Sequence, residues 1–206
     1  MSLFGWLKRK LKILGGAGQP HPADHPGLPV SEDLLRLKGN ARLAYLARTM
    51  RRVEPLFFQI PPLVPHLRQL LNGIESDVAG ISQINCDRLK RRFAGPLNTF
   101  AVKDSDDQFV RMLFSLGELG GSGSSFEILL RDCVSAVEKH VSKEAAGVVA
   151  AAMIHDFEVL ANYETDLPRY RYNVFPPVPV SVCGDLWPSG PPSSWRAFVN
   201  SLQARE

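Results

Sequence analysis

The residues best suited to acid–base chemistry in this chain are His155, Asp156 and Glu158. A carboxylate beside a histidine, on a segment with few polar neighbours, is where burial and charge most often perturb ionisation. His155 and Glu158 are three residues apart, so they share one face of a helix, as metal ligands on helices do. A complete metal site needs further ligands, and the sequence holds no second motif of this kind. We therefore predict a hydrogen-bonded structural histidine and no metal site.

Cysteines are the other candidates for covalent chemistry. Cys86, Cys133 and Cys183 are widely spaced and form no Cys-x-x-Cys pair, which argues against a disulfide framework or zinc site and favours a reducing compartment. Cys133 and His140 would share a helical face, but about 10 Å apart along its axis, beyond hydrogen-bond reach. The residues therefore identify no catalytic set and no cofactor. A small enzyme with a site near His155 or Cys183 remains an alternative.

The segment that positions His155 runs from Ser142 to Glu164. Between Ala145 and Ile154 it contains no charged or polar side chain, so every face of a helix there is apolar. Helices of this kind are normally buried, and this one is shorter than the roughly 20 apolar residues that a bilayer requires. We expect it to be the central helix of a soluble helical domain, enclosed by the other helices.

Periodic apolar positions predict further helices at 31–53, 66–93, 104–117 and 125–141 and from Ser193 onward. Gly39-Asn40 weakens the first of these helices and is a point at which it could bend or divide. The helix at 125–141 is expected to form an antiparallel hairpin with the apolar helix that follows it. The predicted fold is all-α, a single-domain bundle of about five or six helices around the buried Ala/Val-rich helix.

Composition divides the chain into three parts. Residues 1–14 are predicted to form a basic amphipathic helix, residues 15–30 a Gly/Pro linker, and residues 31–206 the helical domain. Within that domain, residues 165–192 are a Pro-rich arm, which we expect to lie extended across the bundle because it is also rich in aromatic residues. Val178 to Val182 could pair there as a short strand.

The N-terminal segment places an apolar stripe beside a cluster of cations. Such a sequence is typical of an interfacial membrane anchor, of a helix that docks on its own domain or in a partner's groove, or of a disordered basic tail. We predict that it binds an anionic membrane surface or a protein partner. The residues assigned to this contact are Phe4, Trp6, Leu7, Lys8, Arg9, Lys10, Leu11, Lys12 and Leu14.

Charge is distributed unevenly along the chain. Residues 1–103 carry 16 basic and 7 acidic side chains, a net +9, whereas residues 104–206 carry 8 and 14, a net −6, so that the total is +3. This split predicts an anionic partner for the N-terminal half, or attraction between the halves within or between molecules. The arginines of 31–53 are expected on a solvated outer face. If the ends of two helices converge, the candidate anion-binding residues are Arg48, Arg51, Arg52, Arg88, Lys90, Arg91 and Arg92.

These patterns favour a non-enzymatic structural or adaptor protein, matrix-like or scaffold-like, over an enzyme. We expect a protein partner or self-association first, an anionic membrane surface second, and nucleic acid third. The expected location is the cytoplasm, with peripheral attachment where the N-terminal segment meets a membrane.

Overall fold

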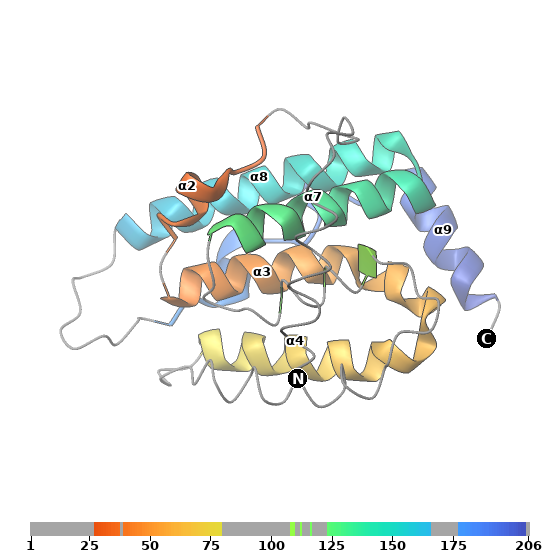
Figure 1. The fold of residues 1–206 in the computed structure, drawn as a ribbon, viewed down its shortest axis with the longest axis horizontal. Coiled ribbons are helices and arrows are strands. Elements are labelled where there is room, and N and C mark those ends of the chain that lie inside the picture. Colours follow the sequence, from red (N-terminus) through yellow and green to blue (C-terminus); the bar gives the residue numbers. More distant parts are fainter. Residues whose placement is uncertain are drawn as a thin grey trace, which may run out of the picture.

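The computed structural model describes residues 27–37, 39–79, 108–109, 112, 116, 123–165 and 177–204. Over these residues the chain forms six α-helices, three short 3-10 turns and no strand (Figure 1). The all-α, single-domain prediction is therefore confirmed. The α-helices are α2 (Ser31–Leu34), α3 (Gly39–Val53), α4 (Val64–Ala79), α7 (Gly123–His140), α8 (Lys143–Thr165) and α9 (Ser193–Gln203).

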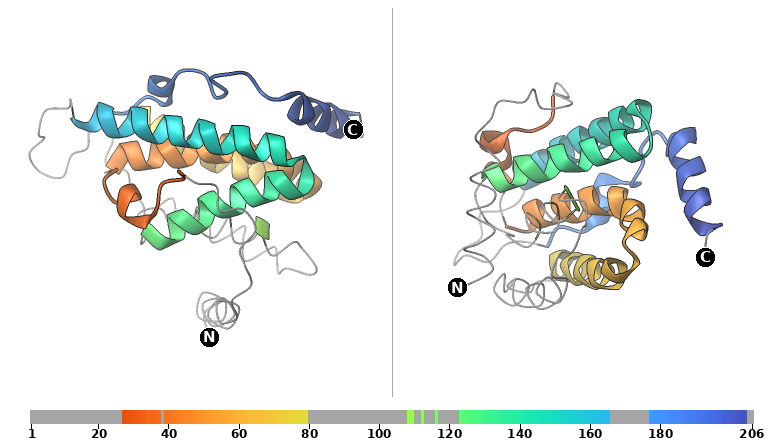
Figure 2. Two further views of the ribbon diagram at one scale, coloured as in Figure 1. Left: turned by 90° about the horizontal axis from the view of Figure 1, so that it is seen from above. Right: turned by 45° about the vertical axis from the view of Figure 1, so that its right-hand side comes forward.

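The helices pack around α3, which lies between α4 and the pair formed by α7 and α8 (Figure 1). Because α7 ends at His140 and α8 begins at Lys143, the predicted antiparallel hairpin is confirmed. The short helix α2 packs against α7. Figure 2 shows α9 at the end of the bundle, beside the turn that joins α7 and α8.

The predicted helix at 31–53 is divided into α2 and α3. Gly39, the first residue of α3, has a φ of +45°, a left-handed conformation that glycine adopts without steric cost. Three prolines that follow α3 lie in two 3-10 turns, η1 (Glu54–Gln59) and η2 (Pro61–Leu63). α4 then begins at Val64, two residues before the predicted start, and the predicted helix beyond Ala79 lies outside the described residues.

The described part of the C-terminal arm is fixed to the end of α4. The amide of Val178 donates to the carbonyl oxygen of Val78 at 2.7 Å, and both side chains are buried. The prediction of a short strand at Val178 to Val182 is wrong, since Val180–Cys183 form a 3-10 turn, η3. The physical reason is the adjacent proline at 179, which lacks the amide hydrogen that a strand ladder requires.

Aromatic rings attach α9 to the arm. The rings of Trp187 and Trp195 lie 5.5 Å apart, and those of Trp195 and Phe198 lie 5.9 Å apart. Trp195 is buried, whereas Phe198, Val199 and Leu202 are half-buried along the same helix. The inward apolar face predicted for the last helix is therefore present.

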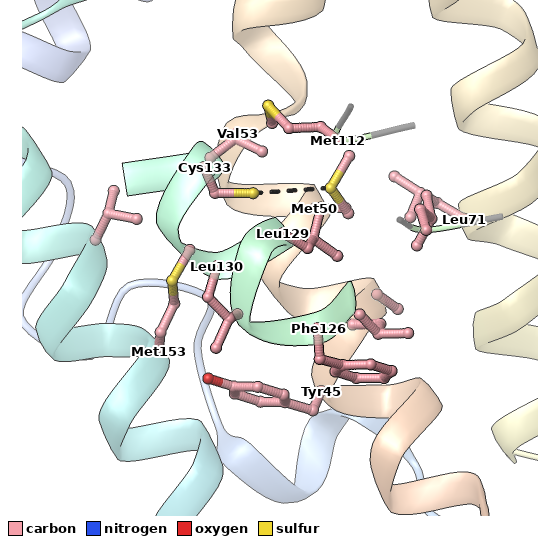
Figure 3. Packing of buried hydrophobic residues seen from close by; sticks show 14 of the residues in the cluster. Tyr45, Met50, Val53, Leu71, Met112, Phe126, Leu129, Leu130, Cys133 and Met153 are labelled. Carbon is pink, nitrogen blue, oxygen red and sulfur yellow. Dashed lines mark hydrogen bonds between the residues drawn. The ribbon is translucent and has the colours of Figure 1, made fainter. Parts of the chain in front are cut away.

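The most enclosed helix is α3, although α8 is the more apolar. Twelve of the 15 residues of α3 are buried. In α8, side chains such as Val149 and Met153 are fully buried, but Gly147 and Ala151 are exposed. The apolar helix therefore contributes a large part of the core, as expected, yet it is not enclosed on every side. Figure 3 shows Tyr45 and Met50 of α3 packed among residues of α7 and near Met153 of α8.

Candidate functional site

A buried group of charged side chains joins α3, α8 and the arm. Arg48 Nε donates to Asp156 Oδ2 at 2.8 Å, and Arg52 Nη1 lies 2.7 Å from the same oxygen. Arg48 and Arg52 are one helical turn apart on α3, so both reach the single carboxylate on α8. The side chain of Arg48 is 6% exposed, and those of Arg52 and Asp156 are 0% exposed. We refer to these three residues as the Asp156 cluster.

Consecutive carbonyl groups of the arm accept further hydrogen bonds from the two arginines. Arg48 donates through Nη1 to the carbonyl of Gly184 at 3.0 Å and through Nη2 to that of Asp185 at 2.8 Å. Arg52 Nε donates to the carbonyl of Leu186 at 2.8 Å. Gly184 has a φ of +69° and a ψ of −149°, a conformation that is essentially restricted to glycine. This turn presents the three carbonyl oxygens to the guanidinium groups.

The Asp156 cluster holds two cations and one anion. An arginine stays protonated in proteins, so the carbonyl dipoles must stabilise the remaining positive charge. Burial, followed by the charge of Asp156, raises the pKa of Tyr45, and the phenol is therefore neutral at physiological pH. The arrangement can hold the arm against α3 and α8. Among the described residues, however, Arg52 Nη2 and Asp156 Oδ1 are buried without a hydrogen-bond partner.

The two described thiols are unreactive in this fold. Burial, with a contribution from Asp156, raises the pKa of Cys183 to about 12. Burial also raises the pKa of Cys133, whose sulfur lies 3.9 Å from that of Met50 (Figure 3). Since the thiolate is the nucleophile, both groups are protonated and inert near neutral pH.

The three residues of α8 that the sequence suggested for acid–base chemistry lie in different environments. Asp156 is completely buried, whereas His155 and Glu158 are exposed. The carboxylate is thus engaged by the arginines of α3 on the inner side of the helix. Across the described ranges of the chain, no three His, Cys, Asp or Glu side chains gather as metal ligands would.

A second ionic network ties α3 to α4. Arg51 donates to Glu75 and to Glu54, each at 2.8 Å, and also to Asn72. The hydrogen bond with Glu75 is the largest cause of the raised pKa of Arg51, so the guanidinium remains charged. Arg68 of α4 pairs with the other oxygen of Glu54 at 2.5 Å. Glu54 therefore joins one arginine from each helix.

The structure separates the candidate anion-binding arginines that it describes. Arg48 and Arg52 converge on Asp156, whereas Arg51 points to the interface with α4. A polyanion would have to displace buried partners to reach the first two. The remaining candidate cations, Arg88, Lys90, Arg91 and Arg92, and the whole of Met1–Leu14 lie outside the described residues.

A surface cleft of about 370 Å³ lies between the start of α4 and the last turn of α9. The guanidinium of Arg68 lies over the ring of Phe58 at 5.0 Å on one wall. The exposed lining is divided almost evenly between polar and apolar atoms, so it favours no particular class of ligand. The lining residues are Phe58, Pro61, Val64, Pro65, Arg68, Leu202 and Gln203.

Comparison with models of protein families, with curated proteins and with solved structures finds no match to this chain. Of the helices in the described part, none is long and apolar enough to cross a membrane. The function is therefore inferred from the residues of the chain itself.

Proposed function

We propose that this chain is a non-enzymatic structural or adaptor protein whose basic amphipathic N-terminus attaches it to an anionic membrane surface. The helical domain would then be displayed at that surface for a protein partner or for other copies of the chain. An acidic, apolar groove on a partner would suit the same N-terminal residues, because it offers the same combination of charge and apolar surface.

The composition of Met1–Leu14 carries this proposal. Its only charged side chains are basic, at Lys8, Arg9, Lys10 and Lys12, and they adjoin an apolar stripe that includes Trp6. Each cation near an anionic bilayer contributes about 1 kcal/mol, so that four contribute roughly 4 kcal/mol. This attraction, added to a short apolar face, favours reversible interfacial binding over insertion.

The charge pairing within the helical domain supports the same proposal. Arg48, Arg51 and Arg52 are all held by carboxylates of the domain. These three arginines of α3 therefore act in packing, although the sequence alone suggested a solvated basic surface. By sequence, the excess positive charge of that half is then concentrated in residues 1–26 and 80–103.

Flotation with vesicles that contain anionic lipid tests the proposal. The parent chain is compared with a chain lacking residues 1–18 and with the variant Lys8→Gln/Arg9→Gln/Lys10→Gln/Lys12→Gln. Loss of four cations should weaken vesicle binding by roughly 100-fold to 1,000-fold, because about 1 kcal/mol per cation is removed.

A matched control removes the same charge from the folded domain. The variant Arg36→Gln/Arg131→Gln/Lys143→Gln/Arg196→Gln changes four exposed cations, one in the turn after α2 and one on each of α7, α8 and α9. It should float almost as well as the parent chain, since these positions lie outside the proposed contact. Equal flotation of the parent and the truncated chain would remove the membrane contact from the proposal.

A further inference from the structure

The outer side of α8 is an open stripe of small residues. Glu144, Gly147, Ala151, His155 and Glu158 are all exposed, and their spacing of three or four residues places them on one helical face. The middle of this face carries no polar side chain. Apart from the helix itself, no heavy atom of the described residues lies within 4 Å of the place where a Cβ on Gly147 would be.

The shape of this face suits a second helix. Val148 and Ile154 are half-buried beside the stripe, so they form apolar margins around a floor of glycine and alanine. Small residues let the backbone of another helix approach closely, and ridges then pack into grooves at about 8–10 Å between the axes. An apolar face of this kind gains stability when it is covered.

The N-terminal segment enters the described structure at this same helix. A Cβ on Gly27 would lie 3.3 Å from Cδ1 of Ile154, and Leu28 packs against the core. Residues 1–26 therefore connect to the chain at the edge of the α8 stripe. The 12 residues from 15 to 26 can span up to roughly 40 Å, which is enough to bring residues 1–14 back along α8.

We infer that Met1–Leu14 docks on the Gly147–Ala151 stripe of α8 when it is not bound to a membrane. Its apolar positions, including Leu7 and Leu11, would cover the stripe. Its cations, which are grouped at positions 8–12, would lie near one acidic end of the stripe, at Glu144 or at Glu158. A helix of 14 residues is about 21 Å long, which matches the distance along α8 from Glu144 to Glu158. This inference rests on the proposed function, because docking and membrane binding would use the same apolar residues.

Docking of this kind would regulate membrane attachment. A ligand that binds only the undocked form has its apparent affinity reduced by the fraction of molecules in that form. If about nine-tenths of the molecules are docked, removal of the α8 contact should strengthen vesicle binding about tenfold. Protein concentration should leave this effect unchanged, since the contact is made within one chain.

Cross-linking tests the docked geometry in the full chain. In a Cys86→Ser background, Leu7→Cys is combined with Ala151→Cys and, as the matched control, with Ala197→Cys on the exposed side of α9. The native Cys133 and Cys183 are buried and protonated, so they do not compete. A short bis-maleimide should join the Ala151→Cys pair within one chain in at least severalfold higher yield than the control pair. Equal yields, or products that join two chains, would overturn the inference.

Vesicle flotation of Gly147→Gln/Ala151→Gln tests the regulatory part. These changes add bulk and polarity to the stripe without adding charge, and Ala197→Gln is the matched control. Stronger flotation of the double variant alone would support the inference, whereas flotation equal to that of the parent would overturn the regulatory role. If selective cross-linking is found but neither the parent nor the double variant floats, the docked contact stands and the proposed membrane function fails.

Discussion

α3 is more enclosed, and α8 less enclosed, than their compositions suggest. α3 carries arginines at 42, 48, 51 and 52, yet 12 of its 15 residues are buried. α8 has no polar side chain from Ala145 to Ile154, yet Gly147 and Ala151 are exposed. The comparison shows that charge pairing and side-chain size decide burial here as strongly as polarity does.

Each helix has a physical reason for its position. The guanidinium groups of Arg48 and Arg52 are tolerated in the core because Asp156 and three carbonyl groups receive their hydrogen bonds. On α8, exposure of a glycine and an alanine loses little hydrophobic stabilisation, since each buried methylene-sized group contributes only about 0.8 kcal/mol. The larger side chains of the same helix, such as Val149 and Met153, are inside.

The largest expected effect comes from the carboxylate that links the two helices. Asp156→Ala would leave the buried guanidinium groups of Arg48 and Arg52 without their anion, which should lower the free energy of unfolding by about 3–5 kcal/mol. Urea denaturation measures this change. Glu158→Ala, an exposed position two residues along the same helix, should change stability by less than about 0.5 kcal/mol. Similar losses for the two variants would contradict the role assigned to Asp156.

Two glycines distinguish the arm that binds α3 from the open face of α8. Gly184→Ala should destabilise the fold by about 1–3 kcal/mol, because alanine is strained at a φ of +69°. Gly147→Ala should instead stabilise it by about 0.5–1 kcal/mol, since alanine is the better helix former and the site is open. Thermal or urea unfolding of the two variants shows whether each change raises or lowers the free energy of unfolding. A destabilised Gly147→Ala variant would show that the α8 face is more crowded than described.

An effect that appears only at alkaline pH concerns the thiol beside the Asp156 cluster. The pKa of Cys183 is raised from 9.0 to about 12, so the unfolded chain loses this proton at a lower pH than the folded chain. Both states keep the proton below pH 9, and stability should fall as the pH rises from about 9 towards 12. At pH 10 the loss from this group is about 1–2 kcal/mol. Unfolding at pH 7.5 and 10 should therefore show a smaller pH-dependent loss for Cys183→Ala than for the parent; equal losses would disprove the assignment.

Local patterns in the sequence predict most of the described fold. Apolar periodicity locates α4, α7 and α9, and the uniformly apolar run locates α8. Gly39-Asn40 marks the point where the first helix divides. The turn between α7 and α8 is also predictable, because the two predicted helices adjoin there. The arm is less predictable, since a proline-rich segment has no period and its 3-10 turn depends on contacts with α3, α4 and α8.

The Asp156 cluster could be predicted only in part. Asp156 stood out because it follows a long apolar run, and this signal pointed to the right helix. Its partners lie 104 to 108 residues earlier, on a helix whose arginines are also compatible with a solvated face. Whether these arginines are solvated or buried depends on the tertiary packing of α3 against α8. The useful signal was an acid in an apolar helix together with two arginines four residues apart on another helix. This combination could have suggested that Asp156 pairs with Arg48 and Arg52.

The carbonyl groups that hold Arg48 and Arg52 also determine when the core can be completed during synthesis. They are 134 to 137 residues further along the chain than the arginines, so α3 is synthesised long before the acceptors of its guanidinium groups. Contacts of such long sequence separation form late and slow folding. The nascent bundle must therefore hold two incompletely bonded cations until residues 184–186 emerge, which makes the last quarter of translation its most vulnerable period for misfolding.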